Sequence, residues 1–203
     1  MDTATLERRG CPVGVAVQAL VGAGAEILQI RHKGHWSRDF FRESEQVAEL
    51  CVGKGVQLVV NDRADFALLL NSGLHVGQDD LPPYDARGLI GTERMLGFST
   101  HNAEQLTAAV REPVDYLALG PIFSTLSKEN PDPEVGLMRL REWRGIASRF
   151  PLVAIGGITR TNALSVIEAG ANSVAVIGDL LPEECTELAL AKRFEEWLRL
   201  LGK

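Results

Sequence analysis

The chain of 203 residues is poor in cysteine and has no excess of positive charge. Its three cysteines are widely spaced and form no C-x-x-C motif; they are Cys11, Cys51 and Cys185. This predicts reduced thiols in a cytoplasmic protein and argues against a disulfide framework. A formal net charge of −6 argues against nucleic acid or an anionic membrane as a partner, although a few focused cations could still bind a small anionic substrate.

Long apolar runs are also missing. No run approaches the ~20 residues of a membrane span, and the polar residues 1–10 lack the apolar core of a signal peptide. No proline- or serine-rich linker and no low-complexity tract divides the chain. Hydrophobic residues still make up 45% of the sequence, which excludes a disordered chain. We therefore expect a single globular domain spanning residues 1–203.

What the sequence does contain is an alternation of short β-rich runs with segments of helical periodicity. The β-rich runs are apolar throughout, as is typical of parallel strands covered on both faces. Ser37, Asn102 and Thr161 are expected to cap the helices that follow them. The predicted strands are 27–30, 57–61, 74–77, 95–99, 116–120, 152–156 and 173–178. The segments with a helical pattern include 13–24, 39–52, 65–70, 103–110, 162–169 and 186–201.

This alternation predicts βαβ units and an α/β fold with a mostly parallel sheet. An eight-stranded barrel would need one more strand before the helix at 13–24, and residues 1–10 contain no β-rich run. A doubly wound open sheet is the alternative. Polar and glycine residues gather at the C-terminal ends of the strands, where barrel active sites lie, so we expect a TIM (β/α)8-type barrel with the first β-strand apparently missing.

Two aspartates follow neighbouring strands. Asp62 comes directly after the strand 57–61, and Asp80 lies just beyond the next strand. Adjacent strand ends about 4.8 Å apart can place two carboxylates around one hard cation, and Mg²⁺ is held by one or two carboxylates plus water and substrate phosphates. The alternative is that both aspartates cap helices or lie in loops.

Cationic residues and candidate phosphate-binding loops follow other strands. Gln29, Arg31 and Lys33 alternate onto one side at the end of the first strand, where two cations could hold a diphosphate. The segment 120–128 combines hydroxyls with Lys128, and Gly156-Gly157 and Ile177-Gly178 end the last two strands, where glycine lets phosphate approach backbone N–H groups. Asp179 is unexpected beside a phosphate. We expect His75 and His101 to be hydrogen-bonded structural histidines.

Six segments in this order resemble the motifs of the thiamine-phosphate synthase family, over about residues 17–181. They are Gln29-Ile30-Arg31-His32-Lys33, with His32 in place of an acid; Asn61-Asp62; the segment from His75 to Asp80; Gly97-Phe98-Ser99-Thr100-His101; the segment from Gly120 to Lys128, with Ser127 in place of a threonine; and the segment from Ala154 to Ile158.

The resemblance implies a transferase that joins a pyrimidine diphosphate to a thiazole phosphate, releasing diphosphate, with Mg²⁺ as cofactor. Asp62 and Asp80 would bind the metal. Lys128, Arg31, Lys33 and Ser99 would be catalytic. Gln29 and Ser99 would contact the pyrimidine, and Arg31, Lys33, Asn61 and Lys128 the diphosphate. Thr125, Ser127, Gly157, Ile177 and Gly178 would hold the thiazole phosphate, and Ile30, His32 and Leu126 complete the substrate-binding set.

Three alternatives to a synthase function stay open. One is a thiazole tautomerase-like isomerase, which the retained Asp62, Asp80 and Lys128 and the presence of Pro121 disfavour. The second is a non-catalytic paralogue that binds thiazole phosphate, and the third is an unrelated phosphate-binding barrel. Whether the chain forms a homo-oligomer is left open by the sequence, and neither nucleic acid nor a membrane is expected as a partner.

Overall fold

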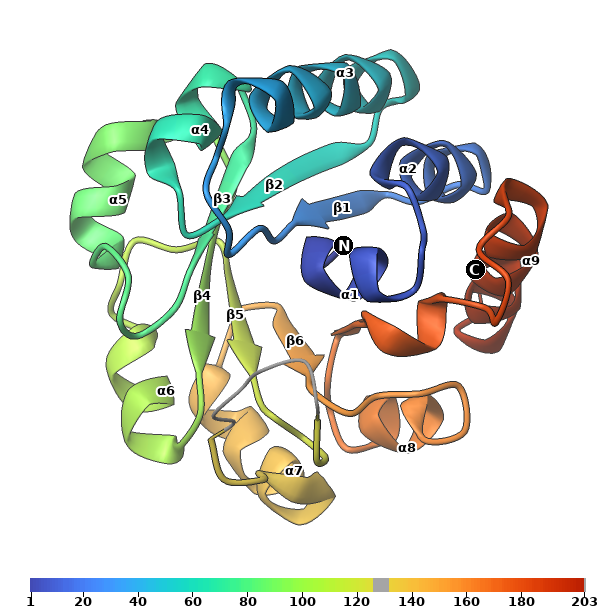
Figure 1. Cartoon of the computed structure of the whole chain (residues 1–203). Helices are drawn as coiled ribbons and strands as arrows, with labels where there is room; N and C mark the ends of the chain where they lie inside the picture. The colour runs from blue at the N-terminus through green and yellow to red at the C-terminus, as the bar shows by residue number, and fades with distance from the viewer. Residues whose placement is uncertain (126–131, 203) are drawn as a thin grey trace. The chain divides into compact units, whose positions relative to one another are not determined.

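The computed structural model describes residues 1–125 and 132–202 (Figure 1). It divides into two compact units, Met1–Leu74 with Leu180–Lys203 and His75–Asp179. Strand β3 runs across the division, because its first two residues belong to the first unit and its last two to the second. The expectation of one domain over residues 1–203 stays a prediction.

The first unit contains the N-terminal strands and the helices from both ends of the chain. Strands β1 and β2 are parallel, with Ile27 opposite Gln57 and Ile30 opposite Val60. Its elements are α1 (Thr3–Arg8), α2 (Val13–Gly22), β1 (Ile27–Ile30), α3 (Arg38–Lys54), β2 (Gln57–Asn61), α4 (Ala64–Leu69), the start of β3 (Gly73–Val76) and α9 (Glu187–Leu200).

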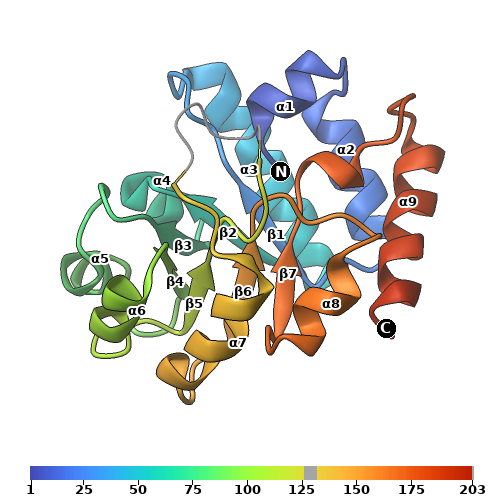
Figure 2. The ribbon, with the colours of Figure 1, turned by 90° about the horizontal axis from the view of Figure 1, so that it is seen from below.

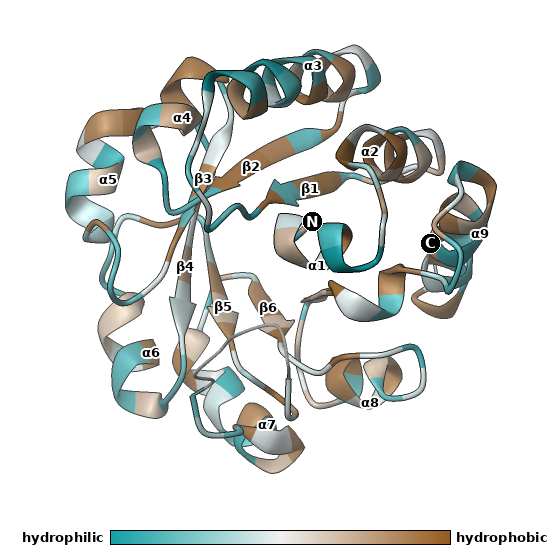
Figure 3. Cartoon of the chain, in the orientation of Figure 1, coloured by the Kyte–Doolittle hydropathy of each residue, from teal (hydrophilic) through white to brown (hydrophobic). Residues whose placement is uncertain are grey.

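Local sequence explains where these helices begin and end. The Ser37 hydroxyl accepts a hydrogen bond from the Phe40 N–H at the start of α3, as predicted. Gly55 ends that helix in the left-handed conformation, with φ of 70°, which glycine adopts without steric cost. Helix α2 is hydrophobic over most of its surface and packs beside α9 (Figures 2 and 3). Leu190 and Trp197 of α9 are buried.

Residues 1–3 lie beside β1 but form only one isolated parallel bridge, between Asp2 and Arg31. The Arg31 N–H donates to the Met1 carbonyl at 2.8 Å, and the Thr3 N–H donates to the Arg31 carbonyl at 3.0 Å. Among the described residues, therefore, no full strand precedes the helix α2, as the sequence predicted. Helix α1 was not anticipated; the Asp2 carboxylate caps it by accepting from the Thr5 N–H.

The second unit continues the strand–helix repeat. Strands β4 to β7 follow one another in chain order and pair in parallel; Gly97 lies opposite Tyr116, Leu117 opposite Leu152, and Val153 opposite Ser173. Its elements are the end of β3, α5 (Pro83–Ile90), β4 (Leu96–Thr100), α6 (Ala103–Ala109), β5 (Tyr116–Leu119), α7 (Gly136–Ala147), β6 (Leu152–Ile155), α8 (Ala163–Glu168), β7 (Ser173–Ala175) and the 3₁₀ helix η1 (Gly178–Leu180).

The predicted strands are confirmed to within a residue or two, except for the last. That strand ends at Ala175, and Gly178 opens η1 instead of ending β7. The prediction that Thr161 caps a helix was wrong, because the residue before α8 is Asn162. Asn102 caps α6 as expected, accepting from the Gln105 N–H at 2.8 Å. Among the described residues no helix is long and apolar enough to cross a membrane.

Candidate functional site

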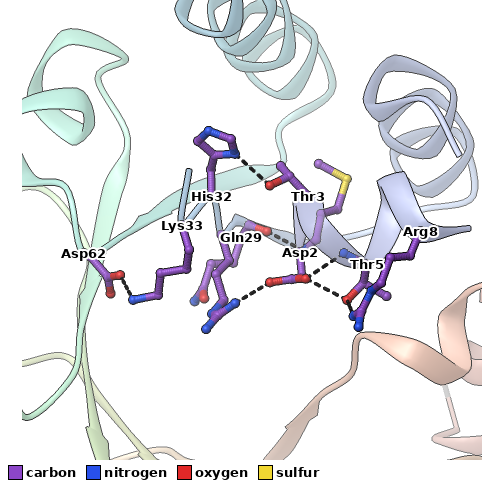
Figure 4. A network of polar contacts seen from close by, with 10 residues as sticks. Asp2, Thr3, Thr5, Arg8, Gln29, His32, Lys33 and Asp62 are labelled. Carbon is purple, nitrogen blue, oxygen red and sulfur yellow. Dashed lines mark hydrogen bonds and ion pairs between the residues drawn. The ribbon is translucent and has the colours of Figure 1, made fainter. Parts of the chain in front are cut away.

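A lysine and an aspartate meet beyond the ends of β1 and β2. The Lys33 ammonium group donates to the Asp62 carboxylate (Figure 4). About half of the Lys33 side chain is exposed, whereas the Asp62 side chain is largely buried. The parallel pairing of the two strands places both residues at the same edge. A cation and a carboxylate that sequence reasoning assigned to one site are therefore in contact.

The Asp62 backbone has an unusual conformation. Its φ is 66°, in the left-handed region that residues other than glycine rarely adopt. The Arg63 N–H donates to the Asn61 carbonyl at 2.9 Å, which closes a tight turn around Asp62. Asn61 itself is buried at the end of β2. Such strain costs of order 1–3 kcal/mol and is concentrated at functional positions.

Arg31 is held by an acidic residue that the sequence analysis did not single out. Its guanidinium group donates to the buried Asp2 carboxylate. Burial raises the pKa of Asp2, but hydrogen bonds from Thr5 and Arg31 outweigh burial and bring that pKa below its ordinary value. Arg31 is therefore a charged group of fixed position, about a quarter exposed, rather than a free surface arginine.

An aromatic cluster, defined here as His32, Trp36, Phe40 and Phe66, supports the segment that carries Lys33. The His32 ring stacks on Phe40 with centroids 4.0 Å apart, and the Trp36 ring stacks on Phe66 at 4.1 Å. The His32 Nδ1 atom is 2.7 Å from the Thr3 hydroxyl, so His32 also reaches the start of α1 (Figure 4). The cluster joins the loop between β1 and α3 to helix α4.

In the second unit, His75 links two strands through neutral hydrogen bonds. Its Nε2 atom is 2.8 Å from the Ser99 hydroxyl, and its Nδ1 atom is 2.8 Å from the Tyr116 hydroxyl. Burial lowers the pKa of His75 to about 4, although the Asp80 charge raises it. A Cβ atom at Gly97 would lie 2.1 Å from the Tyr116 ring, so glycine there makes room for this pair.

The segment after β3 makes polar contacts within itself and with β4. The Asp80 carboxylate accepts from the Gly77 N–H at 2.7 Å. The Gln78 amide group donates to the Ser99 carbonyl at 2.6 Å. His75, Gln78 and Ser99 therefore form one hydrogen-bonded set, which fixes the buried Ser99 hydroxyl. The expectation that His75 is a structural, hydrogen-bonded histidine is confirmed, and His101 likewise contacts the Gly120 carbonyl.

The glycine turn after β6 is pressed against the loop that follows β5. Gly156 and Gly157 have φ values of 88° and 64°. A Cβ atom on Gly157 would lie 2.4 Å from the Ser124 carbonyl oxygen, so glycine is required there by both conformation and space. The predicted site residue Thr125 is the last one described before 126–131. Leu126, Ser127 and Lys128 lie outside the described residues.

The unexpected Asp179 has an ion-pair partner. The Arg160 Nε atom is 2.9 Å from an Asp179 carboxylate oxygen, and the Arg160 N–H also donates to that oxygen. This pair ties the segment after β6 to η1, where Gly178 lies. A Cβ atom on Gly178 would meet no heavy atom within 4 Å, and Gly178 does not have a positive φ. A serine would therefore fit at this position.

The donor chemistry of the predicted metal ligands fits magnesium. Asp62 and Asp80 both supply carboxylate oxygens, and each already has a hydrogen-bond donor on one oxygen. Asp62 belongs to the first unit and Asp80 to the second. Among the residues that the structure describes, no three His, Cys, Asp or Glu side chains cluster as they do in a zinc site. Magnesium needs only one or two carboxylates.

Parallel strands whose C-terminal ends carry cations, carboxylates and glycine turns are typical of α/β enzymes that act on phosphorylated substrates. The family described as "Thiamine monophosphate synthase" matches residues 7–180. A thiamine-phosphate synthase from Koribacter versatilis is 50% identical over 183 residues, covering 90% of this chain and 83% of the relative. One from Chlorobium phaeovibrioides is 43% identical, covering 93% and 91%. The chain belongs to the thiamine-phosphate synthase family, and its function is that of a transferase in thiamine biosynthesis.

Solved structures agree with this assignment. Thiamine phosphate pyrophosphorylase from Pyrococcus furiosus superimposes with a TM-score of 0.83 and 28% identity, covering 96% of this chain and 92% of that one. A second pyrophosphorylase, from Bacteroides thetaiotaomicron, has a TM-score of 0.62 at 18% identity and shows the fold alone. The prediction of a TIM-barrel-type α/β fold is thereby confirmed, and the doubly wound alternative is excluded.

Some residues of the candidate site escaped the sequence analysis. Asp2, Tyr116 and Arg160 each hold a predicted site residue or segment in place, yet none belongs to a motif of its own. Trp36 and Phe66 were missed for the same reason. His32 stands in place of an acid in the first motif, but pattern alone could not tell that its ring stacks on Phe40.

Proposed function

We propose that the chain transfers the 4-amino-2-methylpyrimidin-5-ylmethyl group from its diphosphate to the nitrogen of a thiazole phosphate. The C–O bond to diphosphate breaks, the electron pair leaves with the diphosphate, and a C–N bond forms to the thiazole nitrogen. The observation that carries this proposal is the contact between Lys33 and the backbone-strained Asp62, next to an Arg31 fixed by Asp2.

The cations of this site would neutralise the departing diphosphate. The pyrimidine amino group can stabilise the positive charge left on the methylene carbon, so the chief task of the protein is electrostatic. A lysine ammonium about 4 Å from an anion gains roughly 4 kcal/mol at an effective dielectric near 20. Lys33, Arg31 and Lys128 are proposed for this role, together with the Asn61 amide.

Asp62 and Asp80 are proposed to hold Mg²⁺. When bound, the ion supplies positive charge at the diphosphate. The ammonium group of Lys33 is paired with the Asp62 carboxylate. We infer that Lys33 transfers this contact to a diphosphate oxygen when substrate binds, because the half-exposed lysine side chain can move whereas the turn at Asp62 is fixed.

The two heterocycles would contact different strand ends. Gln29 and Ser99 are proposed to bind the pyrimidine, with the Ser99 hydroxyl oriented by the neutral His75. Backbone N–H groups at Gly157, Ile177 and Gly178, with the Thr125 and Ser127 hydroxyls, are proposed to bind the thiazole phosphate. The close approach of Gly157 to Ser124 supports this proposal. It leaves no room for a side chain at residue 157, so the backbone there carries none. Ile30, His32 and Leu126 complete the proposed contact set.

A cytoplasmic location is part of the proposal. Cys11, Cys51 and Cys185 are all free thiols, as suits a reducing compartment. The expected partners are the two small phosphorylated substrates, and residues 1–203 are proposed to act as one domain.

The deciding experiment incubates the purified chain with both substrates, with Mg²⁺ and with EDTA, and measures thiamine phosphate by fluorescence after oxidation. We expect product that depends on both substrates and disappears with EDTA. Full activity in EDTA would contradict the roles given to Asp62 and Asp80. Tight binding of thiazole phosphate without turnover would instead support a non-catalytic paralogue.

A further inference from the structure

Three polar side chains form a continuous hydrogen-bonded chain across neighbouring strands of the second unit. The Tyr116 hydroxyl, at the start of β5, is 2.8 Å from the Nδ1 atom of His75 in β3. The Nε2 atom of the same ring is 2.8 Å from the Ser99 hydroxyl in β4. His75 and Ser99 are both buried, with 7% and 9% of their surface exposed. The two hydroxyl groups are therefore linked to each other through one imidazole ring.

The backbone holds Tyr116 at a fixed place in this chain. Gly97 of β4 lies opposite Tyr116. The preceding residue pair is joined twice, because the Asp115 N–H donates to the Leu96 carbonyl at 2.8 Å and the Leu96 N–H donates to the Asp115 carboxylate at 2.7 Å. A Cβ atom at Gly97 would lie 2.4 Å from the Tyr116 hydroxyl oxygen and 2.5 Å from His75 Nδ1. Glycine at residue 97 therefore leaves the room that this hydrogen bond needs.

The His75 ring transmits a direction from one hydroxyl to the other because it is neutral. Burial lowers the pKa of His75 to about 4, so near neutral pH the ring has one N–H group and one bare nitrogen. If Nδ1 accepts from Tyr116, then Nε2 carries the hydrogen and donates to the Ser99 oxygen. In the opposite arrangement the Ser99 hydroxyl donates to Nε2, and the Nδ1–H group donates to Tyr116. The direction at one end of the ring thus fixes the direction at the other.

The chemistry of the two hydroxyl groups selects the first arrangement. A phenol is a much stronger acid than an aliphatic alcohol, so it is the better hydrogen-bond donor and the poorer acceptor. Tyr116 therefore donates to Nδ1 of His75, and the Nε2–H group donates to the Ser99 oxygen. The hydrogen of the Ser99 hydroxyl is then available for an acceptor on a ligand.

We propose that Tyr116 is a positioning residue for pyrimidine recognition, which acts through His75 to make the Ser99 hydroxyl a donor to a ring nitrogen of the pyrimidine. This inference rests on the proposed function, which places the pyrimidine at Ser99. The ring nitrogens of an aminopyrimidine only accept hydrogen bonds, whereas its amino group donates them. A donating Ser99 hydroxyl therefore selects a ring nitrogen. The Gln78 amide group donates to the Ser99 carbonyl at 2.6 Å, which fixes the backbone that carries this hydroxyl.

Nitrogen-15 NMR of protein labelled at histidine tests the direction without any substrate. We expect the His75 ring to carry its hydrogen on Nε2 at about pH 7, and the loss of the signal in H75Q identifies it among the four histidines of the chain. A hydrogen on Nδ1 would overturn the proposal, because Ser99 would then be the donor to His75.

Tyr116→Phe tests the effect on substrate, since it removes the hydroxyl and keeps the ring. Calorimetry with the pyrimidine diphosphate alone should show a Kd about 3- to 10-fold higher, the scale of one neutral hydrogen bond. The KM for the pyrimidine diphosphate should rise likewise, and the KM for the thiazole phosphate should not change. Tyr84→Phe removes the same group from the other tyrosine, which is exposed in α5, and should match the parent chain. Thermal melting of both variants checks that they fold.

A double variant decides whether Tyr116 acts through Ser99. In S99A the hydroxyl is already gone, so adding Y116F should change the Kd for the pyrimidine diphosphate less than two-fold. An equally large effect of Y116F with and without the Ser99 hydroxyl would mean that Tyr116 contributes only packing, and would overturn the proposal. If pyrimidine binding follows the expected pattern but the parent chain makes no thiamine phosphate, the proposed reaction is refuted and the role of Tyr116 is supported.

Discussion

The ammonium group of Lys33, beyond β1, is paired with the carboxylate of Asp62, a residue held at a φ of 66° beyond β2. A strained backbone and a charge pair thus coincide at one residue. An asparagine there keeps an oxygen for Lys33 and tolerates the left-handed conformation better than most residues. It loses the full negative charge that a metal ion requires.

Asp62→Asn should therefore separate activity from stability. We expect turnover to fall at least ~100-fold, the scale for losing one transition-state electrostatic group, with no drop in melting temperature. Product fluorescence and thermal melting measure the two quantities. Asp39→Asn, an exposed carboxylate in the first turn of α3, is the matched control and should keep near-parental turnover. Equal turnover of the two variants would remove Asp62 from the mechanism.

Lys128 lies outside the described residues, so its role depends on the sequence motif alone. Lys128→Ala should lower turnover at least ~100-fold if its ammonium group neutralises the leaving diphosphate. Lys54→Ala, at the last residue of α3, removes the same charge from an exposed position outside every motif and should leave turnover unchanged. A steady-state assay with both substrates compares the variants, and a near-normal rate for Lys128→Ala would refute its assignment.

Trp36 should support both stability and the position of Lys33. Trp36→Ala removes the ring stacked on Phe66, and we expect the free energy of unfolding to fall by about 3–5 kcal/mol and the KM for the pyrimidine diphosphate to rise. The Trp36 indole N–H has no hydrogen-bond partner within the described part of the chain, so Trp36→Phe loses no hydrogen bond.

Trp36→Phe is therefore the informative comparison. It should recover most of the KM and much of the stability, measured by urea unfolding and by initial rates. If both variants lose stability but keep the parental KM, the aromatic cluster is only part of the hydrophobic core and does not position Lys33.

His75 should make stability depend on pH. Its pKa is about 4 in the folded chain and 6.5 as the ordinary value, so between these limits the unfolded chain binds more protons. The free energy of unfolding should therefore fall as pH drops from about 7 to about 4, by roughly 3 kcal/mol from this residue, and rise again as pH increases.

Urea unfolding at a series of pH values measures this dependence. His75→Gln removes the titrating group while keeping a donor and an acceptor for Ser99 and Tyr116. The difference between the two curves isolates His75 from carboxylates that titrate at similar pH. Parallel curves for parent and variant would mean that His75 titrates alike in the folded and unfolded chain.

Gly178 and Gly157 should respond in opposite ways to an added side chain. A Cβ atom at residue 178 would meet no heavy atom within 4 Å, so the stability of Gly178→Ser should stay within ~0.5 kcal/mol of the parent chain. The new hydroxyl should lower the KM for the thiazole phosphate a few-fold. Gly157→Ser places a Cβ 2.4 Å from the Ser124 carbonyl oxygen at a φ of 64° and should reduce both stability and turnover. Thermal melting and KM measurements compare them. A higher KM in Gly178→Ser would contradict a phosphate contact there.

Sequence alone was enough for the parallel topology, for the positions of all strands but the end of the last, and for finding the motifs. Local patterns suffice for these features. An apolar run of strand length marks a buried strand, and a glycine or asparagine that follows it marks the strand end, and both signals lie within a few residues. The run at 57–61 and the cap at Ser37 are examples. The family motifs extend this to function, since each combines a strand end with the charge or glycine that phosphate chemistry needs.

Only the tertiary structure decided which groups hold the motif residues in place. Asp2 lies almost thirty residues before Arg31, Tyr116 is far along the chain from His75, and Arg160 pairs with Asp179 from the next strand end. These contacts depend on which strand ends become neighbours, and no local pattern encodes that. The left-handed Asp62 was likewise invisible, because its conformation is imposed by the turn between Asn61 and Arg63 and not by its own preference.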